Sequence, residues 1–563
     1  MYRSLLNSIG ILCLAALWRP VAAMGSGNTA YMRRVLLAAQ AGLDPSLVLD
    51  DKMDFHSLIS HPPHQEPPPE TEFVTIPIDH NDSSVGTYQN RYWVSEKFFQ
   101  PGSPVIMYDA GELNAQNLAA LHLASDTSFF TRLLKEFNAM GIVWEHRYYG
   151  ESAPFPISLD TPPEHFKYLT TRQAIEDIPY FAQNFTRVNY TDVDLTPKGT
   201  PWVMVGGSYA GTRAAFMRNE HPETIFAALS SSAPIQAQVD MTSYFDQVYR
   251  AMVANGYSNC TRDIHAAYQY IDGQLAEDTG SAAAIKRLFF GEEGAQNSNE
   301  DFTGALTHLY DYFQGYGLGG VNGNIAQLCD HIEHDPSTNQ TAGPDGVAAM
   351  YGGRYAAERM AAWPLLVRVT NSNLGLNCGP ENDTLPVNCE LGKPSTDADT
   401  ISWSWQYCTE WGFYQSNNAG EHALLSRFQT LQYQQEICNR QFPDAVAAGV
   451  LPATPEADRV NSEFGGWTVR PSNTMFSVGE FDPWRTLSVL SAEEFAPQDV
   501  VWSSDVPRCG EVRDTVFGYV VPNSEHCFDF QLISDEGKAS MEVFKSALKQ
   551  WLPCFVKGVG GEA

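Results

Sequence analysis

Short apolar runs alternate with helix-patterned segments in the first part of the chain. The runs typical of strands are residues 73–78, 87–94, 104–108, 141–145 and 202–205. Between them, residues 129–140 and 171–185 carry apolar side chains at helical spacing. Thr171 is a candidate N-cap of the second helix, and Pro179 is expected to kink it. Strands that alternate with helices predict a mainly parallel sheet covered on both faces.

The alternation fades after about residue 235 and returns after residue 449. Helical patterns, glycine-rich turns and an aromatic cluster at residues 403–414 fill the interval. Strand patterns then reappear at residues 474–478 and 516–521. The last predicted helix presents its apolar side chains on one face, at Met541, Phe544, Leu548 and Trp551.

We therefore expect an α/β chain whose sheet core is interrupted by a helical cap. The predicted core comprises residues 71–234 and 450–563, and the predicted cap comprises residues 235–449.

The first residues have the layout of a secretory signal peptide. Arg3 gives a positive start, residues 11–18 form a short apolar run, and small residues lead to a cleavage site after Ala23. Residues 24–70 form an N-terminal arm, rich in proline at its end, that is a candidate propeptide. No later stretch approaches the roughly 20 apolar residues of a membrane span, so we expect no membrane association after the signal is removed.

Sequons and cysteines agree with export into an oxidising compartment. The candidate glycosylation sites are Asn81, Asn184, Asn189, Asn259, Asn339 and Asn382. Of the 10 cysteines, Cys13 lies in the signal; eight of the others suffice for four disulfides and leave one spare. The middle of the chain holds most of them and is expected to be cross-linked within itself, through Cys260, Cys329, Cys378, Cys389, Cys408 and Cys438. We expect a secreted protein, or one of a vacuolar or lysosomal lumen.

The chain is strongly acidic, with a formal net charge of -31. Such a surface repels phosphates, which argues against a nucleic-acid partner. The charge favours a soluble protein in acidic surroundings. Neither the charge nor the composition indicates the oligomeric state, and a homodimer is one possibility.

Ser208 is the candidate nucleophile. It stands in Gly206-Gly207-Ser208-Tyr209-Ala210-Gly211, after an apolar strand and before a helix pattern. A serine hydroxyl needs a positioned base, and α/β hydrolases place the serine on a tight strand-to-helix turn with small neighbours. Ala210 occupies the second small position of the G-x-S-x-G pattern.

Asp482 and His526 are the candidate acid and base. Each follows one of the late predicted strands, and the order serine, aspartate, histidine is that of α/β hydrolases. The alternative acids near them are Glu480 and Glu525, whereas Asp529 lies too close beyond His526 to be preferred.

Two backbone N–H groups are candidates for the oxyanion hole, those of Tyr209 and Gly111. A side chain of the cap is an alternative to Gly111. No metal site is expected, because the histidine pairs His331/His334 and His61/His64 lack further ligands.

Several motifs resemble the family of prolyl carboxypeptidase and dipeptidyl-peptidase II, including its fungal extracellular carboxypeptidase-like members. The matching segments are residues 145–152 (EHRYYGES), 206–211, 168–174, 408–415 and 482–484 (DPW). The resemblance extends from about residue 73 to the C-terminus. It implies an α/β-hydrolase fold with Ser208, Asp482 and His526 as the triad.

It further implies cleavage of peptides after proline by exopeptidase action at acidic pH, without a cofactor. Trp484 would then line the proline pocket, and Glu410 would either bind a substrate amino group or play a structural part. The alternatives are dipeptidyl-peptidase or prolyl endopeptidase action, a secreted carboxylic-ester hydrolase, and a non-catalytic binding protein. Departures from the family pattern at Thr212, residues 485–488 and residues 524–527 leave the pocket and the specificity open.

Overall fold

A computed structural model describes residues 69–126, 128–319, 323–379, 386–418, 420–531 and 535–557. The predicted signal peptide, nearly all of the N-terminal arm and Asn382 lie outside the described residues.

A nine-stranded sheet forms the centre of the molecule, in the order β1-β2-β4-β3-β5-β6-β11-β13-β12. Its strands are β1 (Thr71–Pro77), β2 (Thr87–Ser95), β3 (Val105–Asp109), β4 (Met140–Trp144), β5 (Trp202–Gly207), β6 (Ala227–Ser231), β11 (Thr474–Gly479), β12 (Trp502–Ser503) and β13 (Val516–Val521). The strand β2 is antiparallel to β1 and β4, and all other pairs are parallel. This confirms the prediction of a mainly parallel α/β sheet.

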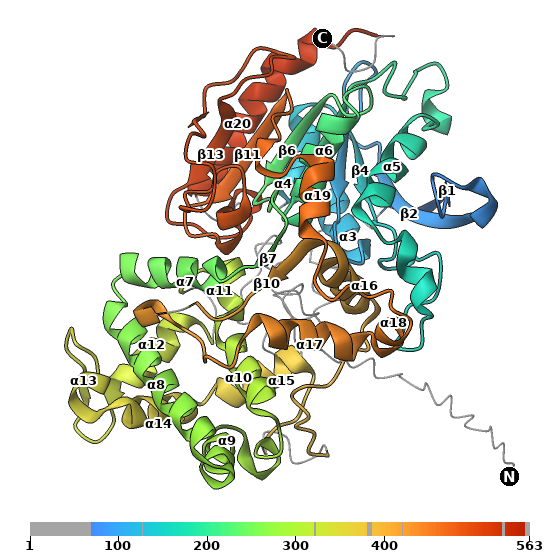
Figure 1. Ribbon diagram of the computed structural model, residues 1–563. Coiled ribbons are helices and arrows are strands. Elements are labelled where there is room, and N and C mark those ends of the chain that lie inside the picture. Colours follow the sequence, from blue (N-terminus) through green and yellow to red (C-terminus); the bar gives the residue numbers. More distant parts are fainter. Residues whose placement is uncertain are drawn as a thin grey trace, which may run out of the picture.

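Helices cover both faces of the sheet. On one face lie α3 (Gln116–Ala124), α4 (Phe129–Glu136) and α20 (Asp535–Trp551), and on the other lie α5 (Thr171–Ala182) and α6 (Tyr209–Glu220) (Figure 1). Successive residues of β3 point to opposite faces of the sheet. Ile106 packs in the core with α3, α4 and α20, and Met107 packs in the core with α5 and α6. The apolar face predicted for the last helix is confirmed, because Met541, Phe544, Leu548 and Trp551 of α20 are all buried.

The start of α5 differs from the prediction. The hydroxyl of Thr170, not that of Thr171, caps the helix by accepting the N–H of Gln173. Thr171 lies one residue further on and donates its own hydroxyl to Glu410. Pro179 lies inside the helix, which continues to Ala182.

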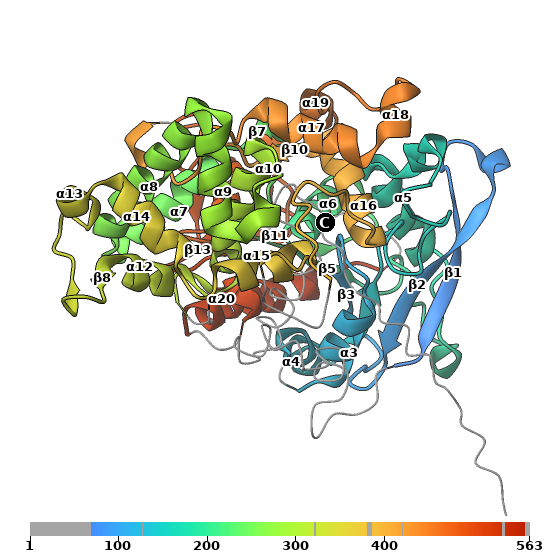
Figure 2. The same ribbon diagram turned by 90° about the horizontal axis from the view of Figure 1, so that it is seen from below.

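A long, mainly helical segment separates β6 from β11. Its elements are β7 (Gln238–Asp240), α7 (Ser243–Ala254), α8 (Ser258–Glu277), α9 (Thr279–Gly294), α10 (Asn299–Ala305), α11 (Asp311–Tyr316), α12 (Ile325–Glu333), β8 (His334–Asp335), β9 (Gln340–Thr341), α13 (Ala348–Tyr351), α14 (Gly353–Ala361), α15 (Leu366–Leu374), α16 (Ala398–Gln406), β10 (Gly412–Tyr414), α17 (Leu431–Gln441), α18 (Pro443–Ala447) and α19 (Ala457–Phe464). Helices α7 to α15 gather below the sheet in Figure 1. Seen from below, they lie away from β1 and β2 (Figure 2).

The end of this segment returns to the core. The ring of Phe464 in α19 stacks on Phe216 of α6, with 4.8 Å between the ring centroids. The helix α19 therefore packs with the sheet domain. The limits of residues 235–449 for the cap stay a prediction.

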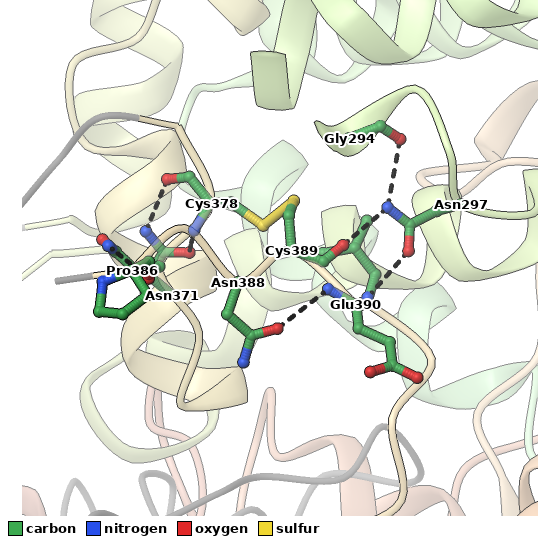
Figure 3. Close-up of a disulfide and its surroundings, with 10 residues drawn as sticks. Gly294, Asn297, Asn371, Cys378, Pro386, Asn388, Cys389 and Glu390 are labelled. Carbon is green, nitrogen blue, oxygen red and sulfur yellow. Dashed lines mark hydrogen bonds between the residues drawn. A yellow bond between two sulfur atoms is a disulfide. The ribbon is translucent and has the colours of Figure 1, made fainter. Parts of the chain in front are cut away.

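Three disulfides cross-link the helical segment: Cys260–Cys329, Cys378–Cys389 and Cys408–Cys438. They use all six cysteines for which internal cross-linking was predicted. Figure 3 shows the second disulfide, where the Asn371 amide bonds both the N–H and the C=O of Cys378, and Asn297 donates to the C=O of Cys389. Among the described residues Cys509, Cys527 and Cys554 are thiols, so three of the four expected bridges are formed.

The described sequons differ in accessibility. Asn81, Asn184, Asn189 and Asn339 are exposed. Asn259 is half-buried at the start of α8, where its amide donates to Glu333 at 2.5 Å. The geometry therefore disfavours Asn259 among the predicted glycosylation sites.

Candidate active site

Ser208 lies on a sharp turn between β5 and α6. Its φ of 59° is in the left-handed region, which is unusual for a residue with a side chain. The turn requires Gly206, because a Cβ there would lie 2.2 Å from the backbone oxygen of Ala210. The N–H of Ser208 donates to the C=O of Ser231 on the adjacent strand, at 2.9 Å. Backbone pairing and strain thus hold the serine at the end of β5, as in a nucleophile elbow.

Asp482 and His526 meet at the ends of β11 and β13. Nδ1 of His526 lies 3.0 Å and 3.1 Å from the two carboxylate oxygens of Asp482, and both side chains are buried. Nε2 of His526 has no hydrogen-bond partner among the described residues. The histidine loop adjoins the serine turn, since a Cβ on Gly207 would lie 2.9 Å from Sγ of Cys527. The structure therefore brings the three predicted residues to one edge of the sheet.

The competing carboxylates are engaged elsewhere. Glu480 accepts the N–H of Asn523 at 2.9 Å. Asp529 is buried between the hydroxyls of Ser231 and Ser477, which both donate to it. The carboxylate of Glu525 lies against Gly317, because a Cβ added to this glycine would come within 2.7 Å of it. Asp482 is the one acid among the four that bonds the His526 ring.

The electrostatics of the pair favour a charged imidazole. Burial opposes the charge, but the adjacent Asp482 carboxylate and, after it, Cys527 together outweigh burial and raise the pKa of His526 well above its ordinary value. A histidine that holds its proton tightly is a strong base when it is neutral. Burial, followed by the Asp482 charge, also raises the pKa of Glu525, to about 8.

The two oxyanion candidates differ in the structure. Tyr209 is the first residue of α6, a position whose N–H has no partner within the helix. The N–H of Gly111 instead donates to Oδ1 of Asp109 at 3.0 Å. Asp109 is itself fixed by a buried ion pair with Arg213. This bond disfavours Gly111 as an oxyanion donor, because its N–H is already used within its own loop, and the role of Gly111 stays a prediction.

The EHRYYGES segment forms a buried polar layer beside the serine turn. Glu145 pairs with Arg91 at 2.6 Å, and Arg147 pairs with Asp177 at 2.5 Å. Burial lowers the pKa of His146 well below its ordinary value, and Nε2 of this histidine lies 3.1 Å from the hydroxyl of Tyr209. The segment therefore supports the residue next to Ser208, a role that the motif gave no means of predicting.

The same layer connects the core to the helical segment. Gln406 at the end of α16 donates to the Tyr209 hydroxyl at 2.9 Å and accepts from Tyr149 at 2.5 Å. The position of Tyr209 is thus set jointly by residues of both parts of the chain.

Trp484 follows Asp482 and lies beside the His526 ring, with 6.3 Å between the ring centroids. It is 5% exposed. Phe413 and Tyr244, from the helical segment, contact its indole edge-on at 5.1 Å and 6.0 Å. The backbone N–H of Trp484 also donates to Oδ1 of Asp482, at 2.9 Å.

Glu410 has a structural position. One carboxylate oxygen accepts the N–H and the hydroxyl of Thr171, at 2.9 Å and 2.8 Å, and the other pairs with Arg459 at 3.1 Å. The side chain is buried. These contacts favour the structural alternative over binding of a substrate amine, because the oxygens of Glu410 are occupied by the first turn of α5 and by Arg459.

The described ranges contain no group of three His, Cys, Asp or Glu side chains placed to hold a metal ion. In the same ranges no helix has the length and apolar character that a membrane crossing requires.

The order of the sheet and the sharp turn at the end of β5 define the molecule as an α/β hydrolase. Residues 77–501 match the model of the family described as serine carboxypeptidase S28. The chain belongs to this family of serine peptidases.

Curated relatives have low identity and long alignments. The probable extracellular serine carboxypeptidase of Arthroderma benhamiae is 26% identical over 442 residues, which cover 74% of this chain and 59% of that protein. The thymus-specific serine protease of Mus musculus is 26% identical over 509 residues, 87% of this chain and 88% of that protein. The lysosomal Pro-X carboxypeptidase of Bos taurus is 22% identical over 495 residues, 86% and 88% respectively.

Solved structures align more loosely. The proline iminopeptidase of Mycobacterium smegmatis has a TM-score of 0.31 and 12% identity, and the alignment covers 85% of this chain and 99% of that chain. An acetylester hydrolase from Corynebacterium glutamicum has a TM-score of 0.33 and 8% identity, with 85% and 95% covered.

Proposed function

We propose that the protein is an exported serine peptidase that cleaves short peptides after proline, with Ser208 as nucleophile, His526 as general base and Asp482 as the residue that orients the base. One observation carries this proposal. Both carboxylate oxygens of Asp482 lie within hydrogen-bonding distance of Nδ1 of His526, which leaves Nε2 for a proton from the serine.

The chemistry is acyl transfer through a covalent intermediate. The hydroxyl of Ser208 attacks the carbonyl carbon of the scissile bond while His526 takes the hydroxyl proton. The N–H of Tyr209 donates to the oxyanion that develops. His526 then gives the proton to the leaving amine, and water releases the acyl group by the same route in reverse.

The preference for proline rests on Trp484 and on one relative. A flat aromatic wall beside the catalytic histidine suits the compact apolar ring of proline, and Phe413 and Tyr244 hold the indole in place. The Bos taurus relative is named a lysosomal Pro-X carboxypeptidase. Carboxypeptidase action is favoured over dipeptidyl-peptidase action because Glu410 is occupied by Thr171 and Arg459.

Export is supported by three features of the chain. They are the leader-like first 23 residues, the disulfides of the helical segment and the exposed sequons. The relatives named extracellular and lysosomal agree with this location. The acidic working range implied by the resemblance is disfavoured by the raised pKa of His526, because a protonated imidazole is no base.

The test is a panel of proline substrates assayed at about pH 4 to 8, a range that spans the titration of an ordinary histidine. It contains a peptide ending in Pro-Xaa, an Xaa-Pro substrate with a free amine, an amino-blocked substrate with internal proline, and a simple carboxylic ester. Cleavage of the first that is absent in Ser208→Ala is the expected result. Cleavage of the ester alone, by folded protein, would replace the proposal with a carboxylic-ester hydrolase.

A further inference from the structure

One residue of the helical segment, Gln314 in α11, touches both loops that carry the proposed acid and base. Its backbone C=O accepts the N–H of His526 at 3.1 Å. Its side-chain Oε1 accepts the indole N–H of Trp484 at 3.0 Å. The same oxygen accepts the hydroxyl of Tyr244 at 3.0 Å, and Gln314 is 3% exposed.

Neighbouring contacts show that these two loops are held from the helical segment. Gln531, just beyond the histidine loop, donates to the C=O of Gly315 at 3.0 Å. On the aspartate loop, Gln247 of α7 donates to the C=O of Glu480 at 2.8 Å. Gln314 differs from these residues because it joins the two loops to each other.

We propose that Gln314 is a positioning residue, through which the helical segment fixes Trp484 relative to His526 and thereby sets the affinity for the substrate. This inference rests on the proposed role of Trp484. Loss of the side-chain acceptor leaves two buried donors unsatisfied, the indole N–H and the Tyr244 hydroxyl, which favours movement of the indole. The backbone bond to His526 survives any side-chain substitution, so the proton transfer to His526 is retained.

The test compares Gln314→Met, which keeps the length of the side chain and removes the strong acceptor, with Trp484→Phe, which keeps an aromatic ring and removes the donor. We expect each variant to raise KM for the substrate cleaved fastest by roughly tenfold, about the effect of one buried hydrogen bond. We expect kcat of Gln314→Met to stay within about twofold. The double variant is expected to have no higher KM than the worse single variant.

Two controls separate positioning from a general loss of structure. Tyr244→Phe removes the other donor to the same oxygen and is expected to change KM much less. The rate of labelling by a fluorophosphonate, which reports the reactivity of Ser208, is expected to be unchanged in Gln314→Met. An unchanged KM in Gln314→Met, an equal fall in kcat and in labelling, or additive effects in the double variant would each overturn the proposal.

The thermal stability of the wild type, the Gln314→Met and Trp484→Phe variants and the double variant tests the contact between Gln314 and Trp484 without any substrate. The fall in Tm of the double variant is expected to be smaller than the sum of the two single falls. A wild-type chain that reacts with the fluorophosphonate but cleaves no proline bond would overturn the proposed specificity. Additive Tm shifts would overturn the coupling instead.

An independent observation concerns two thiols at the end of the last helix. The thiol of Cys509 donates to the C=O of Trp551 at 3.6 Å, and that of Cys554 donates to the C=O of Gln550 at 3.7 Å. The Cys509 loop is docked there, because the side chains of Gln550 and Trp551 both donate to the C=O of Pro507 at 2.9 Å. Burial, followed by an interaction with the Cys554 thiol, raises the pKa of Cys509.

We infer that Cys509 and Cys554 form a fourth disulfide when the chain passes through an oxidising compartment. The oxidant is the disulfide of an exchange protein. One thiolate attacks that disulfide and releases one of its sulfurs, and the second thiolate then displaces the other. The two cysteines lose two electrons and two protons, and the exchange protein leaves as a dithiol. Cys527, which is 4% exposed beside the active site, remains the unpaired cysteine.

The test counts thiols in the full chain secreted by a eukaryotic host and denatured without reductant. Maleimide labelling is expected at Cys527 alone, and Cys509→Ser is expected to add label at Cys554. Mass spectrometry of a non-reduced digest is expected to give a peptide pair joined through Cys509 and Cys554. Labelling of all three cysteines in the wild type, or a different pairing, would overturn the inference.

Discussion

Asp482 contacts His526 and Trp484 with one carboxylate. Its oxygens lie 3.0 Å and 3.1 Å from Nδ1 of His526, and Oδ1 also accepts the backbone N–H of Trp484 at 2.9 Å. The same side chain therefore orients the proposed base and begins the short helical turn that carries the proposed pocket residue. A substitution at Asp482 tests the first of these contacts without the second.

Asp482→Asn is expected to lower kcat by about 10⁴-fold while the protein stays folded. The amide oxygen is still able to accept the N–H of Trp484, but the amide favours the wrong imidazole tautomer. The measurement is kcat on the best proline substrate, with Tm as the check of folding. Glu480→Gln, on the same loop, is the matched control and is expected to change kcat by no more than a few-fold. Comparable losses in both variants would exclude Asp482 as the specific partner of His526.

The dependence of kcat/KM on pH reports the protonation of His526. Because Asp482 and Cys527 together outweigh burial and raise the pKa of His526, activity is full above the raised pKa and is lost as the pH falls through it. We expect the acidic limb to lie above about pH 6.5, the value for an ordinary histidine. A limb near about pH 4 would show that the family's acidic working range applies and that Asp482 does not control the base.

Local patterns were sufficient for the framework of the fold and for the order of the candidate triad. Alternating apolar residues marked the strands that now carry Ser208, Asp482 and His526 at their ends. The residues of these loops were identifiable because an α/β sheet exposes its chemistry where the strands end. Their proximity follows from the strand order, in which β5, β6, β11 and β13 are neighbours.

Contacts between distant segments were not predictable. Glu410 bonds Thr171 across 239 residues, and Trp484 bonds Gln314 across 170 residues. Nothing in the local sequence at Gln314 indicates a partner, because its helix has six residues and no motif. Gly111 was a candidate oxyanion donor, whereas its N–H donates to Asp109, two residues away.

Glu410→Ala is expected to lower stability and to leave substrate preference unchanged. The substitution leaves the N–H and hydroxyl of Thr171 buried without their acceptor, at a cost of about 1–3 kcal/mol. The measurements are Tm and the ratio of kcat/KM for free-amine and amino-blocked substrates. Arg459→Ala removes the more exposed partner of the same carboxylate and is expected to lower Tm less. A selective rise in KM for the free-amine substrate would restore Glu410 as an amine-binding residue.

Glu525→Gln tests a carboxyl group that is neutral in the folded protein over an unusual pH range. Burial, followed by the charge of Asp482, raises the pKa of Glu525 to about 8, against about 4.3 in an unfolded chain. Between these values the folded state holds a proton that the unfolded state has lost. Stability therefore falls as the pH rises through this range, by up to a few kcal/mol.

A glutamine has nearly the same shape and no charge to bury, so it removes this loss. We expect Glu525→Gln and the wild type to have similar Tm at about pH 4.5, and the variant to melt a few degrees higher at about pH 8.5. Glu480→Gln, which alters the half-buried carboxylate facing Asn523, is expected to show no gain at the higher pH. An equal Tm difference at both pH values would mean that folding does not raise the pKa of Glu525, and would contradict the prediction.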